Sequence, residues 1–186
     1  VTKKARPAQG YGMTEVCGII TYIAGDVFVE RPSSCGYLAP TFDGKVIDEK
    51  GKELPVGEMG EVCVKGAAVI KGYLNRPEAT AETIVDGWLH TGDIGYFDEE
   101  GFLYLVDRAK DMILRGGENI YGAEVEFAVF DHPAVLECVA FAVPDERFGE
   151  EVGVAIHLKD GAMLDASGLR EHLSTRLAAF KVPKYI

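Results

Sequence analysis

A run of charged residues at positions 107–111, DRAKD, divides the chain into two segments with different patterns. Four of these five residues carry a charge, which suits an exposed connection between two folding units. Short apolar stretches separated by Gly, Pro and Asp turns precede the run, whereas longer strands and amphipathic helices follow it. We therefore predict an α+β protein of two parts, residues 1–108 and 109–186.

The first segment has the pattern of a β-rich unit. Residues 16–40 contain repeated Gly and Pro without a sustained period, which indicates loop with short strands. A helix is predicted over 75–85, because Asn75 can cap it and Pro77 fits its first turn. The predicted strands cover 45–48, 61–65, 88–97 and 102–106, the last two joined as a hairpin. This pattern indicates a small barrel or folded sheet.

The second segment mixes helices and strands. Helices are predicted over 122–130 and 165–177, the second one capped by Asp165 and carrying a leucine stripe. The predicted strands cover 112–114, 135–143 and 151–158. This segment is therefore expected to be a small α+β domain.

Composition excludes some partners. Lys and Arg number 19 against 30 Asp and Glu, a net charge of −11. Nucleic acid and anionic membranes attract basic surfaces, so neither is an expected partner. The apolar content of 47% is enough for a core, and no apolar run approaches the ~20 residues of a membrane-spanning helix. A phosphate ligand remains compatible, because a pocket can be locally positive.

The cysteines and histidines are widely spread and show no paired metal spacing: Cys17, Cys35, Cys63, Cys138, His90, His132, His157 and His172. Reduced, mostly buried thiols are favoured over zinc ligands or a disulfide framework. We expect a cytoplasmic protein, which an acyl substrate of the longer protein could bring to a membrane surface.

Residues 9–15, QGYGMTE, combine residue types that suit a ligand site. The glycines would let a backbone approach a ligand closely, and Tyr11 could lie flat on a planar base. The Thr14 hydroxyl beside the Glu15 carboxylate could serve phosphate oxygens and a hard cation. From these residues alone, an ordinary turn leading into a strand is the commoner explanation.

Three further clusters also have two interpretations each. WLHTGD ends in Asp93, whose carboxylate could bind two neighbouring sugar hydroxyls or simply sit in a hairpin turn. Arg108 offers a planar fork of donors for ribose or phosphate, or belongs to a solvated linker. Gly116 and Gly117 permit close approach of a thin ligand, or form a hairpin turn with positive φ.

The order of these stretches resembles the adenylate-forming superfamily of acyl-CoA synthetases, luciferases and peptide-synthetase adenylation domains. The stretches are QGYGMTE, GEVCVKG at 60–66, GYLNRPEAT at 72–80, WLHTGD and DEEGFLYLVDRAKDMILRGGENI. The resemblance covers nearly the whole chain, and the combined spacing makes chance implausible. It favours the ligand interpretation of each stretch, and the pattern is most similar to a fatty-acid or related acyl-CoA ligase.

The resemblance implies a reaction in two steps. A carboxylic acid, expected to be a fatty acid, attacks the α-phosphate of ATP and gives acyl-adenylate and pyrophosphate. CoA then takes the acyl group. The implied cofactors are ATP, Mg²⁺ and CoA.

The resemblance also implies roles for the residues of QGYGMTE. Tyr11 would pack on the adenine, with Gly10 and Gly12 keeping that wall thin. Thr14 would contact the phosphate, and Glu15 would hold Mg²⁺.

The remaining roles implied by the resemblance fall on later residues. Asp93 would accept hydrogen bonds from both ribose hydroxyls, and Arg108 would support the ribose. Lys110 falls at the hinge about which a C-terminal domain rotates between the half-reactions. The loop with Gly116 and Gly117 would approach the nucleotide and line the pantetheine tunnel.

By this resemblance the first part is the β-rich, distorted-barrel end of a large N-terminal domain, and the second is a mobile C-terminal α+β domain. The superfamily's upstream phosphate loop and its lysine near the C-terminus have no counterpart here; Lys181 and Lys184 precede that lysine motif. We expect a portion of a longer ligase, inactive in adenylation by itself. Two alternatives stay open, an adenylation module that loads a carrier protein and a non-catalytic nucleotide-binding module.

Overall fold

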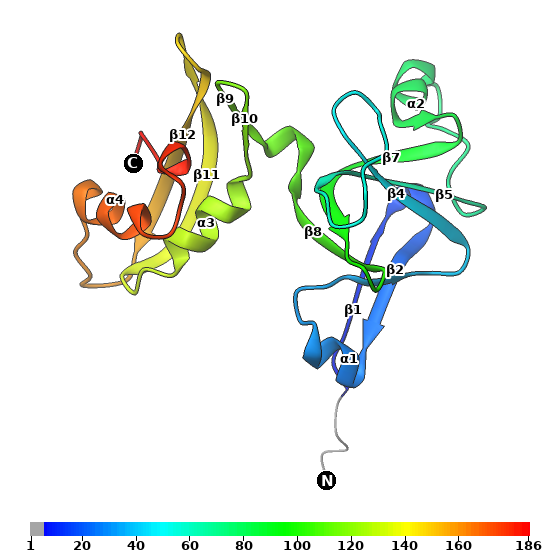
Figure 1. Ribbon diagram of the computed structural model, residues 1–186, viewed down its shortest axis with the longest axis horizontal. Helices are drawn as coiled ribbons and strands as arrows, with labels where there is room; N and C mark the ends of the chain where they lie inside the picture. Colours follow the sequence, from blue (N-terminus) through cyan, green and yellow to red (C-terminus); the bar gives the residue numbers. More distant parts are fainter. Residues whose placement is uncertain (1–5) are drawn as a thin grey trace. The chain divides into compact units, whose positions relative to one another are not determined.

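The structure is a computed structural model that describes residues 6–186. The chain forms two compact units, residues 1–105 and 106–186, which we call the N-terminal and C-terminal units (Figure 1). The division between the units falls within strand β8 (Phe102–Arg108). The domain boundary at residues 108 and 109 stays a prediction.

The N-terminal unit is built on an 8-stranded sheet with the strand order β1-β2-β3-β8-β7-β5-β4, and β6 pairs with β7. The two ends of this path, β1 and β4, do not pair with each other among the described residues, so the sheet is open and no barrel closes. The other elements of this unit are β1 (Ala8–Met13), η1 (Thr14–Val16), β2 (Gly18–Ala24), α1 (Gly25–Glu30), β3 (Gly36–Leu38), β4 (Phe42–Ile47), β5 (Gly60–Gly66), α2 (Pro77–Thr83), β6 (Ile84–Val85) and β7 (Trp88–Phe97).

The hairpin and the helix predicted for this unit are present, with two corrections. Helix α2 was predicted over 75–85 with Asn75 as its cap, but it begins at Pro77, and Arg76 stands at the N-cap without a side-chain capping bond. Pro77 lies in the first turn as predicted, and the helix ends at Thr83 because residues 84–85 become extended and pair with β7. Helix α1 lies in the stretch expected to be loop and short strands. All its described residues are at least partly exposed, so it has no apolar face that sequence periodicity could reveal.

The core of the N-terminal unit packs on one face of the sheet. Its buried residues are Val16, Ile20, Cys35, Phe42, Val62, Val64, Leu89 and Leu103. Each fully buried Val or Leu contributes about 1.5–3 kcal/mol to stability. Cys63 points to the opposite face from its neighbours Val62 and Val64, yet it is also fully buried. Both faces of the sheet are therefore covered here, whereas the alternating pattern predicted only one.

At the start of β7 lies Trp88, the only tryptophan of the chain. The Nζ atom of Lys45 lies 4.4 Å from the centroid of its ring, and that of Lys65 lies 5.9 Å away. Lys45 lies on β4 and Lys65 on β5, so two cations from consecutive strands of the sheet lie near the indole.

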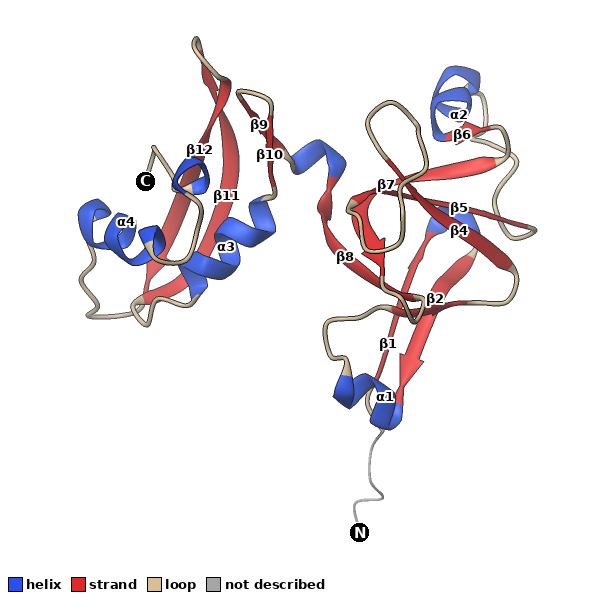
Figure 2. Ribbon diagram, in the orientation of Figure 1, coloured by secondary structure: helices blue, strands red, loops and turns tan. Residues whose placement is uncertain are grey.

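The C-terminal unit contains a second, 4-stranded sheet with the order β10-β9-β12-β11 (Figure 2). Its two long strands form one antiparallel ribbon. The elements are η2 (Ala109–Asp111), β9 (Ile113–Arg115), β10 (Glu118–Ile120), α3 (Gly122–Phe130), β11 (Val135–Asp145), β12 (Gly149–Leu158), α4 (Ala166–Ser174) and η3 (Ala179–Lys181).

Helices α3 and α4 pack their apolar residues against this sheet. The shared core consists of Ile113, Ile120, Val125, Ala128, Val129, Val135, Val152, Val154, Leu169, Leu173 and Leu177. Asp165 caps α4 as predicted, because its Oδ1 accepts a hydrogen bond from the Gly168 amide at 2.8 Å. The helix ends at Ser174, earlier than predicted. The mixed α+β class predicted from the sequence is thus confirmed.

In the described part of the chain, no helix has the length and apolar character needed to cross a membrane.

Candidate functional site

The structure joins two residues that are far apart in the sequence, Tyr11 on β1 and Asp93 on β7. The Tyr11 hydroxyl donates a 2.6 Å hydrogen bond to Oδ2 of Asp93. Asp93 is only 7% exposed. A buried carboxylate needs such donors, because burying it without hydrogen bonds would cost about 1–3 kcal/mol or more. The hydrogen bond therefore joins the part-buried Tyr11 ring to a buried carboxylate.

An irregularity in strand pairing sets the direction of Asp93. Cys63 of β5 pairs with His90 of β7, and Glu61 pairs with Ile94, so the register shifts between them. The extra residues of β7 bulge out of the ladder, and a bulge of this kind re-aims side chains. Gly92, in the bulge, has φ of +70°, which a residue with a Cβ rarely adopts.

Glu61 and Thr91 hold this bulge in place. The Glu61 carboxylate accepts a hydrogen bond from the Gly92 amide at 3.0 Å, and its other oxygen lies 2.9 Å from Nδ1 of His90. The buried Thr91 hydroxyl donates to the Val62 carbonyl at 2.7 Å and accepts from the Asp93 amide at 3.1 Å. Asp93 is thus positioned by bonds on both sides of the bulge.

Gly10 and Gly12 are required by the approach of β2. A Cβ on Gly12 would lie 2.1 Å from the Gly18 carbonyl oxygen, and one on Gly10 would lie 2.9 Å from that of Thr21. The first distance cannot occur without a backbone shift. The sheet itself therefore needs small residues on both sides of Tyr11.

Thr14 and Glu15 form the short 3₁₀ turn η1 that follows β1. The Tyr73 hydroxyl donates a 2.7 Å hydrogen bond to Oε1 of Glu15, and the Ile70 amide donates to the Glu15 carbonyl at 2.8 Å. The bond to Glu15, aided by partial burial, raises the pKa of Tyr73. The loop before α2 thus fixes both the backbone and the carboxylate of Glu15.

Arg108 and Lys110 lie in the connecting segment at the end of β8, and both are exposed. Asp107 organises this segment: Oδ1 accepts from the Arg108 amide at 2.7 Å, and Oδ2 accepts from the Ala123 amide at 3.2 Å. The second bond satisfies one of the amides at the start of α3. The connecting segment is thereby joined to the first turn of that helix.

Gly116 and Gly117 form the turn between β9 and β10, with φ values of +59° and +92°. A hairpin turn with positive φ, one of the two interpretations of this loop, is present. The Gly116 amide donates to the Phe148 carbonyl at 2.8 Å, and a Cβ on Gly116 would lie 3.0 Å from the Phe148 ring.

Ion pairs hold this turn against β12. Arg115 donates to both oxygens of Glu151 at 2.7 and 3.0 Å, and Glu151 is only 4% exposed. This contact lowers the pKa of Glu151 and raises that of Arg115. Lys184 donates to Asp145 at 2.7 Å, and this bond, with two backbone amides, lowers the pKa of Asp145 to about 2.

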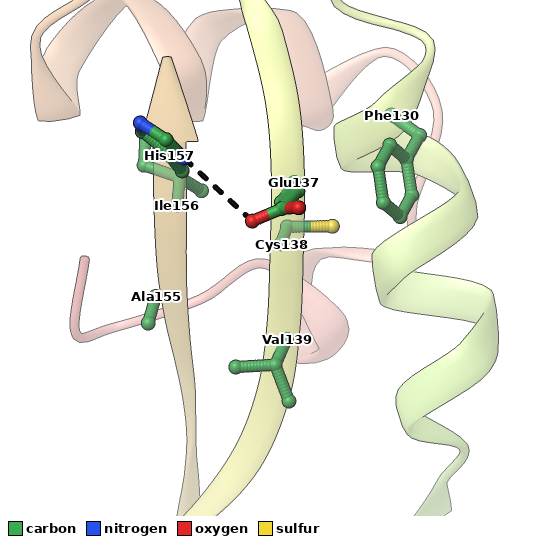
Figure 3. A pocket seen from close by; sticks show the side chains of 7 residues that line it. All are labelled: Phe130, Glu137, Cys138, Val139, Ala155, Ile156 and His157. Atoms are coloured by element: carbon green, nitrogen blue, oxygen red, sulfur yellow. Dashed lines mark ion pairs between the residues drawn. The ribbon is translucent and has the colours of Figure 1, made fainter.

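A shallow hollow on the C-terminal unit is lined by side chains from β11, β12 and the end of α3, and it includes none of the predicted site residues (Figure 3). Glu137 and His157, 3.6 Å apart, sit on its exposed side. Cys138 points toward α3, where its Sγ lies 3.6 Å from the Glu126 carbonyl oxygen. Burial raises the pKa of this thiol to about 11, so it stays protonated.

Within the N-terminal unit, the structure brings Tyr11 to Asp93 and places Thr14 and Glu15 directly after β1. The predicted residues of the connecting segment and of the β9–β10 turn belong to the C-terminal unit. Three supporting residues, Tyr73, Glu61 and Thr91, were not predicted from the sequence. All three lie in stretches that carry the family resemblance, GYLNRPEAT, GEVCVKG and WLHTGD, so a signal for them was present.

Comparison with known proteins gives a consistent result. The family model of the AMP-binding enzymes matches residues 2–74, and that of the AMP-binding enzyme C-terminal domain matches residues 124–186. A feruloyl-CoA synthase of Amycolatopsis sp is 43% identical over 96% of this chain and 36% of its own length. A long-chain-fatty-acid–CoA ligase of Bacillus subtilis is 45% identical over 95% of this chain and 31% of its own length.

A solved structure is similar as well. An o-succinylbenzoate CoA synthetase from Bacillus subtilis, in complex with its acyl-adenylate intermediate, superimposes with a TM-score of 0.85 at 38% identity. This match covers 95% of the present chain and 36% of the other. The same enzyme has also been solved with ATP and magnesium, with a TM-score of 0.84. The chain spans about a third of the length of the relatives it matches. It belongs to the adenylate-forming superfamily of AMP-binding enzymes.

Proposed function

We propose that this chain is a portion of an ATP-dependent acid–CoA ligase, which activates a carboxylic acid as its acyl-adenylate and transfers the acyl group to CoA. The observation that carries this proposal is the hydrogen bond between the part-buried Tyr11 and the buried Asp93, with Thr14 and Glu15 directly after the strand that holds Tyr11. Relatives with similar sequences are named as CoA ligases or CoA synthases that act on several different acids.

In this proposal Asp93 binds the ribose of ATP. An ionised carboxylate has about four lone-pair directions, so the bond from Tyr11 is compatible with two more from ribose hydroxyls. The Tyr11 hydroxyl is tied to Asp93, which fixes the plane of its ring for stacking on adenine. Gly10 and Gly12, required by the sheet, add no side chain beside that ring.

The residues of η1 fit the phosphates and a magnesium ion. Mg²⁺ prefers hard oxygen ligands, and Glu15 supplies a carboxylate while Thr14 supplies a hydroxyl. The bond from Tyr73 would keep the Glu15 carboxylate oriented, as second partners of metal ligands do. When bound, the ion neutralises charge on the phosphate oxygens.

The residues of the C-terminal unit act at a later stage in this proposal. Arg108 supports the ribose, and Lys110 lies at the hinge about which the C-terminal unit turns between the half-reactions. The turn with Gly116 and Gly117 approaches the nucleotide and the pantetheine of CoA. The ion pairs of Arg115 and Lys184 would keep that turn rigid during such a movement.

We propose a fatty acid as the substrate. The relatives act on other carboxylic acids too, and these acids should also be tested. Ligases of long-chain fatty acids, of ferulate and of 2-succinylbenzoate match this chain at similar identity. We propose a cytoplasmic enzyme whose partners are ATP, a carboxylic acid substrate and CoA, and whose acyl substrate could bring it to a membrane surface.

The test is carboxylate-dependent ATP–pyrophosphate exchange by the longer protein that carries this chain, run over fatty acids of increasing length, aromatic propenoic acids and succinylbenzoate. We expect exchange with one class of acid, followed by thioester formation with CoA. The 186-residue chain alone is expected to show no exchange, and robust exchange by it would contradict that part of the proposal.

Variants at Asp93 separate the remaining possibilities. Asp93→Ala is expected to abolish exchange, whereas Tyr22→Phe, an exposed tyrosine on β2, leaves it unchanged. Transfer to a phosphopantetheinyl carrier protein in place of CoA would favour a carrier-loading module. ATP binding without exchange for any acid would favour a non-catalytic nucleotide-binding module.

A further inference from the structure

Three side chains that sequence spacing does not connect meet between β5 and β7. Glu61 and Cys63 are two residues apart on β5, so they lie on the same face, and Cys63 pairs with His90 of β7. The carboxylate of Glu61, the thiol of Cys63 and the imidazole of His90 each offer one donor atom, and these atoms all lie within 4.8 Å of one another.

The Cys63 thiol has no hydrogen-bond partner among the described residues, although it is fully buried. A bound cation would stabilise the thiolate form of this side chain. An unpaired buried sulfur that faces an imidazole and a carboxylate is the arrangement that a soft divalent metal uses.

We propose that Glu61, Cys63 and His90 form a zinc site in the N-terminal unit. Cysteine sulfur, histidine nitrogen and carboxylate oxygen are the ligands that Zn²⁺ takes in proteins, at bond lengths of about 2.0–2.3 Å. Tetrahedral bonds of that length place donor atoms roughly 3–4 Å apart. The observed distances need only small side-chain movements to reach this range.

The surroundings suit a bound divalent ion. A thiolate and a carboxylate together balance the charge of Zn²⁺, and binding sends the Cys63 proton to solvent. The Gly92 amide already holds one oxygen of Glu61, which leaves the oxygen beside His90 as the metal ligand. The side chains of Glu61 and His90 are 24% and 26% exposed, so the ion enters from their side and water completes its coordination.

Lys45 pairs with Cys63 across β4 and β5, and its Nζ lies over the Trp88 ring at 4.4 Å. A bound ion would tie β5 directly to β7 beside the bulge that carries Asp93. The expected result of binding is therefore a more stable N-terminal unit, independent of any catalytic activity.

Cobalt and zinc titrations of the 186-residue chain test this site. One equivalent of Co²⁺ is expected to give the absorption band of a cobalt–thiolate bond, and Zn²⁺ is expected to displace it. Cys63→Ser removes the band. Loss of a residue that only supports a metal ligand typically lowers metal affinity by ~10- to 100-fold. His90→Gln and Glu61→Gln each remove a proposed ligand, so we expect them to lower the affinity for Co²⁺ by more than this.

Two cysteine variants serve as controls. Cys35→Ser changes another buried thiol of the same unit, and Cys17→Ser changes the exposed thiol; both are expected to keep the band. Zinc-edge X-ray absorption of the wild-type chain is expected to show one sulfur with nitrogen and oxygen neighbours, a readout that does not depend on how the variants fold. The proposal would be overturned if the cobalt–thiolate band survived in Cys63→Ser or was lost in Cys17→Ser. A zinc coordination shell without sulfur would overturn it as well.

Discussion

The two candidate ligand-contacting regions are held in place by different chemistry. In the N-terminal unit, hydrogen bonds from Tyr11 and to Thr91 hold Asp93 in the interior of the protein. In the C-terminal unit, an ion pair between Arg115 and the buried Glu151 holds the start of the β9–β10 turn, and a more exposed pair joins Lys184 to Asp145. The first region depends on hydrogen bonds to a buried carboxylate, and the second depends on opposite charges.

This difference predicts different responses to conditions. Salt screens charges that face water, and protonation of a carboxylate removes its ion pair, whereas buried hydrogen bonds respond little to salt. High salt and low pH are therefore expected to loosen the C-terminal turn before they affect the Asp93 region.

The largest expected effect is on nucleotide binding by the Asp93 region. Asp93→Ala removes a charged acceptor of ribose hydroxyls, worth about 1.5–3 kcal/mol for each hydrogen bond. We expect ATP binding by the longer protein to weaken by about 100-fold or more, measured by calorimetry. Hydrogen exchange in the C-terminal unit should stay unchanged, and a loss of protection there would contradict the independence of the two regions.

The second effect concerns the stability of the C-terminal unit. Glu151→Gln leaves the Arg115 guanidinium without its bidentate carboxylate, and we expect a loss of about 2 kcal/mol in the free energy of unfolding. Hydrogen exchange of β9 and β12 measures it. The matched control is Glu146→Gln, an exposed glutamate on the neighbouring turn. Equal protection of the β9 and β12 amides from hydrogen exchange in the two variants would show that the ion pair does not hold the turn.

A smaller effect is expected for Tyr73→Phe in the N-terminal unit. This change removes one hydrogen bond to Glu15, worth about 1 kcal/mol, and leaves the ring in place. The magnesium concentration that gives half-maximal exchange in the longer protein should rise by about fivefold. An unchanged magnesium requirement would remove Glu15 from the proposed metal ligands.

The smallest effect is the pH dependence of the C-terminal unit. The pKa of Asp145 falls from 3.8 to about 2, and that of Glu151 is also lowered. A carboxyl with a depressed folded-state pKa stabilises the fold above its unfolded pKa, and this contribution is lost as the pH falls through the folded value. Stability should therefore decline between about pH 4 and pH 2. Urea unfolding at several pH values measures the decline, and Lys184→Gln should flatten it; an equally steep decline in that variant would contradict the assignment.

Local pattern was enough to predict the hairpin of β7 and β8, helix α3 and the Asp165 cap, because each depends on residues close in the sequence. The family resemblance then pointed to Tyr11, Glu15 and Asp93 as candidate site residues, and their roles remain predictions.

The contacts between these residues were beyond the sequence. Tyr11 and Asp93 are 82 positions apart, and Tyr73 lies 58 positions from Glu15, so only the paired strands and loops bring them together. The convergence of Cys63 and His90 depends on the register of β5 against β7, and no spacing rule reveals it. The bulge at Gly92 is likewise a property of two strands together.

The lone tryptophan has a practical consequence. Trp88 stands two positions before His90 on β7, near Lys45 and Lys65, and the C-terminal unit contains no tryptophan. The tryptophan fluorescence of the protein therefore originates in one half of the chain. Emission excited at the indole gives a built-in optical label for the N-terminal unit, so that its unfolding and its response to ligands or metal can be followed without any attached dye.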